Sequence, residues 1–167
     1  MKTKSIFPAL FITAVGAVWL SSCNGSSVDT VKSLESNYEN QNKKIELTGE
    51  FDAPSFTFAS SRSKTLGMHF VVKPHAISSE KFIVTDVVLP IGTDKNTVVM
   101  DIADDQKNYT LKDFYIYDKD GNKYNLDEHT QFKISGTVSY NELEKEESDR
   151  RTDNFAYKLT DVTIEKD

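Results

Sequence analysis

The 167-residue sequence has little of several residue types, and each scarcity narrows what the protein can be. It contains a single cysteine, Cys23, so no disulfide can form within one chain, because pairing needs two thiols. Lysine and arginine number 20 against 26 aspartate and glutamate residues, for a net charge of −6. Nucleic-acid binding depends largely on basic residues that neutralise phosphates, so this balance argues against a nucleic-acid partner.

Long apolar runs are also scarce, and the one that is present lies near the beginning of the sequence. Residues 6–20 are uncharged and mostly apolar, and they follow Lys2 and Lys4. The run is shorter than the ~20 residues that a transmembrane helix needs, and Pro8 and Gly16 interrupt it. Positive charge followed by a short apolar run is typical of a secretory signal peptide, which is removed from the mature protein.

The residues that end this run, Leu20-Ser21-Ser22-Cys23, resemble the lipobox of bacterial lipoproteins. In that family the cysteine thiol receives a diacylglyceryl group, the chain is cut just before it, and the new amino terminus is acylated. The resemblance implies a signal peptide over residues 1–22, lipid attachment at Cys23 and a polar tether over 23–27. Several acyl chains on one residue anchor a protein firmly, since each buried methylene contributes ~0.8 kcal/mol. The alternative is a free cysteine buried in a core helix.

Asn24 follows this cysteine and bears on the location of the protein. In enterobacterial lipoproteins an aspartate at this position retains the product at the inner membrane, so the resemblance implies the outer membrane of a Gram-negative bacterium. Residues 24–28 lack the acidic run that sends some lipoproteins to the cell surface, which favours a periplasm-facing position over a surface-exposed one. Loss of Lys2 and Lys4 with the signal peptide would leave 18 basic and 26 acidic residues, a net charge of −8.

Residues 28–167 have the length of one domain, and a helix is predicted at its start, over 28–40. Ser27 is a suitable N-cap for this helix, and Asp29 suits its first turn. Apolar residues that recur every three or four positions form one stripe. The stripe consists of Val28, Val31, Leu34 and Tyr38.

From residue 44 onward the period of the apolar residues changes to two, which is typical of strands with one buried face. The segment KIELTGEF places Ile45, Leu47, Gly49 and Phe51 on the buried face. Further strands are predicted over 55–60, 66–73, 81–89, 96–102, 109–118, 123–126, 132–140 and 155–166. So many strands with one helix predict a closed or nearly closed antiparallel barrel, with an immunoglobulin-like β-sandwich as the alternative.

Both ends of the domain resemble the OB-fold lipoproteins and the periplasmic OB-like domains related to the anticodon-binding fold. The matching residues are Gly49 in the first strand, then Gly136, Val138, Asp161, Val162 and Ile164 in the last two. A glycine inside a strand marks a bend or bulge, which a small barrel needs to close. The resemblance implies an OB-like antiparallel β-barrel behind a short helix. Residues 67–130 hold more strand signal than five strands require, so an extra hairpin is predicted there.

No motif in the sequence points to catalysis, a metal or a cofactor. The segment DKDGN, residues 118–122, begins like a calcium loop, but the sixth and twelfth positions hold Lys123 and His129 in place of glycine and glutamate. It is typical of a hairpin turn. The three histidines are scattered, and neither a G-x-S-x-G elbow nor a phosphate-binding loop is present. We therefore expect no enzyme, no metal and no cofactor.

Binding is the function that the sequence leaves. OB barrels hold ligands on one strand face, between the loop joining the first two strands and the loop joining the last two. These loops would cover 52–65 and 141–154. The candidate ligand-binding residues on them are Phe56, Phe58, Arg62, Lys64, Arg150 and Arg151.

Aromatic and arginine side chains on such loops suit contact with a protein, a peptide or a glycan. The alternatives are that the two phenylalanines belong to the core and that the charged loop is merely solvated. The sequence predicts a lipid-anchored, non-enzymatic binding or scaffolding module whose ligand it does not identify. The rival interpretations are a surface-exposed glycan- or protein-binding lipoprotein and a hydrolase or an inhibitor of one.

Overall fold

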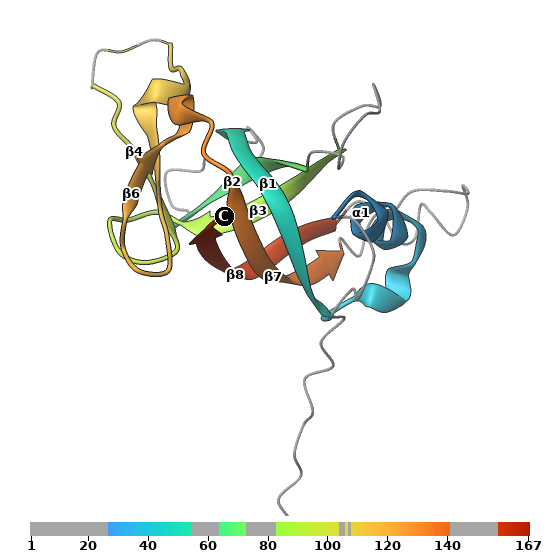
Figure 1. Cartoon of the computed structure of the whole chain (residues 1–167). Helices are drawn as coiled ribbons and strands as arrows, with labels where there is room; N and C mark the ends of the chain where they lie inside the picture. The colour runs from blue at the N-terminus through green and yellow to red at the C-terminus, as the bar shows by residue number, and fades with distance from the viewer. Residues whose placement is uncertain (1–26, 55–63, 73–82, 104–105, 107, 141–156) are drawn as a thin grey trace, which may run out of the picture.

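The structure, a computed structural model, describes residues 27–54, 64–72, 83–103, 106, 108–140 and 157–167. Within these residues the chain forms a closed five-stranded barrel and a three-stranded sheet, preceded by one α-helix (Figure 1). The prediction of a mainly β, OB-like barrel behind a short helix is confirmed. The immunoglobulin-like sandwich is wrong, because the first strand pairs with a late one and the sheet closes on itself.

Five strands make up the barrel: β1 (Lys44–Pro54), β2 (Thr65–Val72), β3 (Ile83–Pro90), β7 (Phe132–Tyr140) and β8 (Tyr157–Lys166). Their order around the barrel is β1-β2-β3-β8-β7, and β7 pairs back onto β1. All neighbouring strands are antiparallel except β3 and β8, which are parallel. A five-stranded barrel with this connectivity is OB-like, and the predicted antiparallel arrangement holds for every pair but that one.

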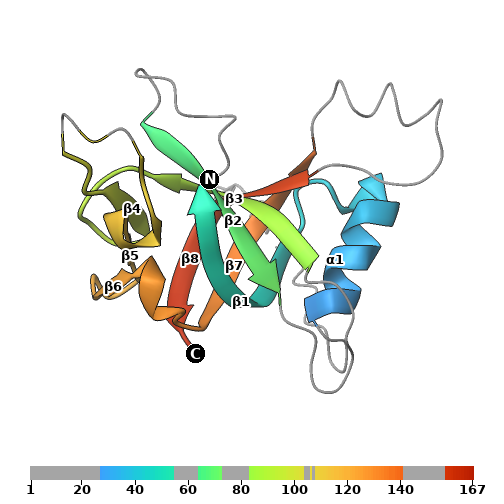
Figure 2. The same cartoon turned by 90° about the horizontal axis from the view of Figure 1, so that it is seen from above.

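The extra strands predicted between residues 67 and 130 form a sheet of their own. It contains β4 (Thr97–Met100), β5 (Phe114–Tyr117) and β6 (Lys123–Asn125), in the order β4-β5-β6 and all antiparallel. In both Figure 1 and Figure 2 this inserted sheet lies beside one end of the barrel, and α1 (Ser27–Ser36) lies beside the other. The barrel therefore separates the helix from the inserted sheet.

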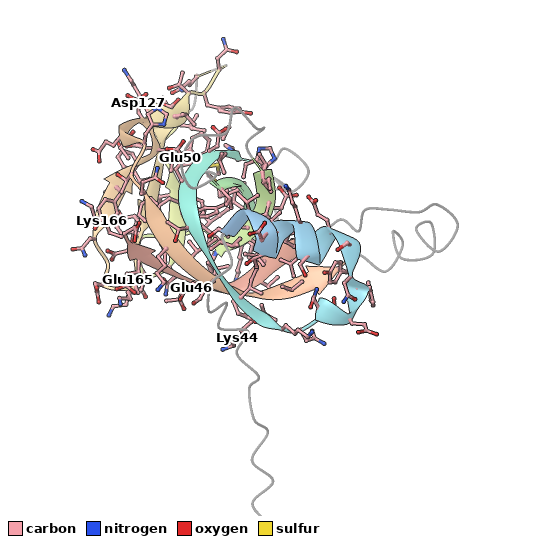
Figure 3. The ribbon with its side chains drawn as sticks, turned by 45° about the vertical axis from the view of Figure 1, so that its right-hand side comes forward. Lys44, Glu46, Glu50, Asp127, Glu165 and Lys166 are labelled. Atoms are coloured by element: carbon pink, nitrogen blue, oxygen red, sulfur yellow. The ribbon has the colours of Figure 1, made fainter. Side chains whose placement is uncertain are left out.

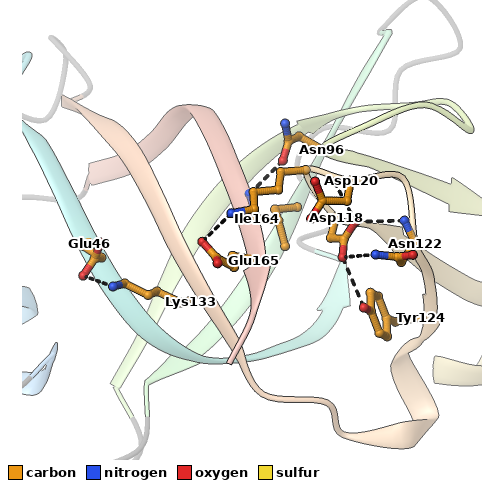
Figure 4. Close-up of polar contacts among 10 residues, drawn as sticks. Glu46, Asn96, Asp118, Asp120, Asn122, Tyr124, Lys133, Ile164 and Glu165 are labelled. Carbon is orange, nitrogen blue, oxygen red and sulfur yellow. Dashed lines mark hydrogen bonds and ion pairs between the residues drawn. The ribbon is translucent and has the colours of Figure 1, made fainter.

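The inserted segment supplies hydrogen-bond partners to β8 where β3 and β8 are no longer paired. Two register pairs join these strands, and farther along β8 the inserted segment supplies the partners instead. The Asn96 side-chain oxygen accepts the Ile164 backbone N–H at 2.8 Å, and the Ile164 carbonyl accepts the Lys119 N–H at 2.8 Å (Figure 4). An ion pair of 2.9 Å between Lys119 and Glu165 reinforces this contact. The main-chain groups of β8 that have no partner on β3 therefore still form hydrogen bonds.

The predicted helix over 28–40 consists of two pieces. Helix α1 ends at Ser36, and a 3₁₀ turn, η1 (Tyr38–Asn40), follows it. Asn37 separates them because it is extended, with φ of −144°, and its side chain accepts the Glu39 N–H at 2.9 Å. A short polar side chain that bonds to the nearby backbone competes with helix continuation. Ser27 lies inside α1 and not before it.

The core fills the barrel and its contacts with α1 and with the inserted sheet. Val31 and Leu34 of the predicted stripe are buried, and Val28 and Tyr38 pack against the core. In β1 the predicted alternation is confirmed, since residues 45, 47, 49 and 51 are all buried. Side chains that are fully buried each contribute ~1.5–3 kcal/mol. The largest of them include Phe70, Phe114, Phe132, Leu47, Met68, Ile134 and Ile164.

The strand predicted over 109–118 is wrong in its first half. Leu111–Asp113 form a 3₁₀ turn, η3, and β5 begins only at Phe114. The Asp113 carboxylate accepts the Thr110 N–H at 2.7 Å, a local bond that favours a turn over a strand. The strand predicted over 123–126 ends at Asn125, where a further 3₁₀ turn, η4 (Leu126–Glu128), begins. The strand predicted over 55–60 lies outside the described residues.

Candidate functional site

Of the predicted ligand-binding residues, the structure describes Lys64. It is exposed and directly precedes β2, and its carbonyl accepts the Ile91 N–H at 2.8 Å, which extends the β2–β3 ladder. The predicted lipid attachment at Cys23 lies outside the described residues. So do the other five predicted ligand-binding residues, which are Phe56, Phe58, Arg62, Arg150 and Arg151.

The two predicted loops join the strands that the OB comparison requires. Residues 55–64 connect β1 to β2, and residues 141–156 connect β7 to β8. At the first loop Thr65 pairs with Pro90, whereas the start of β8 lies beside the middle of β3, where Lys158 pairs with Asp86. The outer face of β2, β3 and β8 therefore lies between the two attachment points. That is the face on which OB barrels bind their ligands.

A row of ionisable side chains crosses this face. His69 on β2 lies directly opposite Asp86 on β3, which in turn pairs with Lys158 on β8. His69 Nε2 lies 3.5 Å from Asp86 Oδ1, and the two side chains are 41% and 40% exposed. A pair this exposed adds at most ~1 kcal/mol to stability, so its side chains are accessible at little cost to the fold.

An aliphatic row lies next to the ionisable one. Val71 on β2 pairs with Val84 on β3, and Val84 is 46% exposed whereas Val71 is 8% exposed. On the other side of the ionisable row, Gly67 pairs with Val88. The face thus offers hydrogen-bonding groups beside apolar surface, which is the combination that a peptide or a sugar ring requires.

His69 lies on the polar, outer side of its strand, as the alternation of apolar residues within β2 requires. Met68, Phe70 and Val72 point inward and are fully buried, and His69 points outward. Asp86 was not recognised as its partner, nor was Lys158 as the next member of the row. The alternation within each strand places all three outside the barrel, but only the register between strands brings them into one row.

Glutamates on the outer side of β1 form ion pairs and hydrogen bonds with residues in or just before β7. Figure 3 shows Lys44, Glu46 and Glu50 along this strand. Glu46 Oε1 lies 2.9 Å from Lys133 Nζ on β7. Glu50 Oε2 accepts a hydrogen bond from Gln131 Nε2 at 3.1 Å, and it lies 3.9 Å from His129 Nδ1. We place the candidate site on the β2–β3–β8 face, where the paired His69 and Asp86 lie beside the exposed Val84.

Tyrosine hydroxyls gather where the barrel meets α1. The Tyr140 hydroxyl lies 2.6 Å from the Leu34 carbonyl and 3.0 Å from the Asn37 carbonyl, so it ties β7 to the end of the helix. Burial raises the pKa of Tyr140 to about 12. Burial also raises the pKa of Tyr157, although the nearby Thr85 hydroxyl opposes this, and those two hydroxyls make no hydrogen bond of good geometry. These phenols stay protonated near neutral pH, as a structural cluster requires.

The turn of residues 118–122 is the β5–β6 hairpin that the sequence predicted. Asp118 is 3% exposed, and its carboxylate accepts hydrogen bonds from the Asp120 and Asn122 backbones, the Asn122 side chain and the Tyr124 hydroxyl (Figure 4). Gly121 adopts φ of +88°, which a glycine tolerates. Within the described ranges, no group of three or more His, Cys, Asp or Glu side chains could hold a metal ion.

No family model, curated protein or solved structure significantly matches this chain. In the part of the chain that the structure covers, no helix is both long enough and apolar enough to cross a membrane. The structure therefore defines a fold, an OB-like barrel with an inserted sheet, and a candidate binding face on it.

Proposed function

We propose that this protein is a lipid-anchored, non-enzymatic binding or scaffolding module of the Gram-negative outer membrane, facing the periplasm. The sequence Leu20-Ser21-Ser22-Cys23 supports the anchor, because a leucine and two small residues before a cysteine follow a short apolar run. The β2–β3–β8 face supports binding. The partner is a protein, a peptide or a glycan, and the acidic balance of the chain disfavours a nucleic acid.

The observation that supports the binding proposal is that polar and apolar side chains lie next to each other on one face. The row of His69, Asp86 and Lys158 offers donors and acceptors, and the half-exposed Val84 beside it offers apolar contact. Binding sites commonly join a few placed polar groups to apolar surface. The ionisable groups here are a single histidine, carboxylate and amine on open strands, a set that suits recognition more than bond cleavage.

The anchor makes a direct prediction for the native product. Expressed in a Gram-negative host, the protein should be recovered in the membrane fraction with Cys23 as its acylated first residue, as measured by mass spectrometry. The Cys23→Ala variant should lack the acyl mass and should leave the membrane fraction. A product that retains Met1 and a free Cys23 thiol would refute the lipoprotein assignment.

Binding at the proposed face is tested with a charge placed beside the ionisable row. Val84→Glu should weaken the binding of a ligand found by screening peptide and glycan arrays, because it places a carboxylate on the apolar surface and next to Asp86. Val84 is 46% exposed, so the fold should tolerate the change. Binding measured by calorimetry should fall at least tenfold.

The matched control for this experiment is Ile102→Glu. Ile102 is 37% exposed and lies after β4, away from the β2–β3–β8 face, and the substitution adds the same charge. It should leave the affinity within twofold of the unmodified protein. Equal losses of affinity in both variants, or unchanged binding by Val84→Glu, would show that the ligand binds to another surface.

A further inference from the structure

We infer that the membrane surface docks against the α1 side of the barrel, so that the inserted sheet β4–β5–β6 points away from the bilayer. This orientation rests on the proposed anchor at Cys23. Its geometry comes from the place where the tether joins the rigid domain and from the length of the tether.

The tether joins the domain at Ser27, which is fixed to the barrel. Its hydroxyl accepts the Thr48 N–H of β1 at 3.0 Å. That N–H lies beyond the end of the β1–β2 ladder, whose last pair is Gly49 with Val72, so Ser27 takes the place that a strand would fill. One and two turns farther along the helix, Val31 and Leu34 are buried in the core. The helix is thus part of the rigid body from its first described residue.

The tether is too short to let the domain turn over. Three residues, 24–26, separate Cys23 from Ser27. Four residue steps span at most ~14 Å when fully extended. A domain of 140 residues has a radius of gyration of about 14 Å, so its far side lies more than twice that distance from an attachment point on its surface. Ser27 and its surroundings therefore stay near the lipid headgroups, and the opposite side does not reach them.

The opposite side is the inserted sheet. Figures 1 and 2 place α1 and this sheet on opposite sides of the barrel in two perpendicular views. Helix α1 also contacts β1 and β3. The end of the β2–β3 pair marked by Thr65 and Pro90 leads directly into Ile91 and the inserted sheet, and so points away from the bilayer.

The tether, and not charge, sets this orientation. Helix α1 carries the acidic side chains of Asp29 and Glu35 against the single basic side chain of Lys32, which gives no net attraction to anionic lipids. The helix therefore rests against headgroups without inserting. The β2–β3–β8 face is left at the side of the anchored domain, where a partner can reach it.

The test places a fluorophore near to or far from the proposed contact. A click-reactive residue replaces Lys32 on α1 or, in a second protein, Asp120 in the β5–β6 turn, so that Cys23 remains the only thiol. Both positions are exposed. The acylated protein is reconstituted in phosphatidylethanolamine–phosphatidylglycerol vesicles that carry a headgroup-linked quencher. Quenching should be several-fold stronger at position 32 than at position 120.

A matched variant tests whether the tether length causes the difference. Twelve glycine and serine residues inserted between Ser26 and Ser27 behave as a random coil with a root-mean-square length of about 20 Å. They should make quenching at the two positions nearly equal while vesicle flotation is unchanged. Equal quenching with the natural tether would overturn the orientation.

Failure of the anchor is distinguishable from failure of the orientation. If mass spectrometry finds no acyl group, the proposed function fails, and the Cys23 thiol is then coupled to a maleimide lipid, which attaches at the same residue. Stronger quenching at position 32 in that protein would still support the orientation, and equal quenching would overturn it.

Discussion

Replacing Gly49 with alanine is expected to destabilise the domain by about 3 kcal/mol, at the upper end of what overpacking costs. Gly49 faces inward in β1 at the point where that strand pairs with both β2 and β7. A Cβ at this position would overlap the Val71 carbonyl oxygen and would lie 2.9 Å from Phe70 Cε1. Backbone of the neighbouring strand cannot rotate away as a flexible side chain can, so the barrel would have to open.

The measurement is the midpoint of urea unfolding followed by circular dichroism. The control is Gly92→Ala, because a Cβ at Gly92 would meet only Thr97 Cγ2, at 3.9 Å. That variant should stay within ~0.5 kcal/mol of the parent protein. A Gly49→Ala protein with the midpoint of the parent would show that β1 does not approach β2 as closely as described.

Asp118→Asn is expected to cost ~2 kcal/mol at pH 7, because hydrogen bonds to a charged group contribute ~1.5–3 kcal/mol. Burial by itself would raise the pKa of Asp118, but the hydrogen bonds from Asn122, Asp120 and Tyr124 outweigh it and hold the pKa below 3.8. In the variant an amide replaces one carboxylate oxygen, so two donors face each other at the Asn122 side chain.

The same carboxylate predicts how stability depends on pH. Its pKa is lower in the folded than in the unfolded protein, so its contribution is complete above the unfolded value and is lost as the pH falls through the folded one. The difference in unfolding free energy between the parent and Asp118→Asn should therefore shrink between about pH 5 and pH 2.

The control is Asp120→Asn, which removes one carboxylate from an exposed position of the same turn. It should change stability by less than ~0.5 kcal/mol at any pH. A difference for Asp118→Asn that does not vary with pH would mean that its carboxylate is not the stabilising group.

Patterns within single segments were enough to predict the class of fold. The alternation of Ile45, Leu47, Gly49 and Phe51, and the stripe of Val31 and Leu34, each depend on neighbours within a few positions, and burial confirms both. The same reasoning placed β7 at residues 132–140 as the structure has it. Periodicity reports which side of an element is buried, and that suffices to predict strands around one core.

Features that depend on contacts between distant segments were not predictable in this way. The side chains of Asn37 and Asp113 stop regular structure by accepting hydrogen bonds from the nearby backbone, a competition that an apolar pattern does not reveal. The row of His69, Asp86 and Lys158 needs the register of three strands, one pair of them parallel. The predicted ligand-binding residues, by contrast, rest on the loop positions that OB barrels use and on side-chain type, and apart from Lys64 they lie outside the described residues.

The contact of Asn96 and Lys119 with Ile164 has a consequence for any attempt to reduce the domain to five strands. Excising the segment between β3 and β7 would expose the amide and carbonyl of Ile164 along an edge of β8 that has no neighbouring strand there. Exposed strand edges of this kind pair with strands of other molecules. The shortened protein would then tend to self-associate edge to edge. The inserted segment therefore covers an edge that would otherwise promote aggregation, besides forming part of the barrel wall.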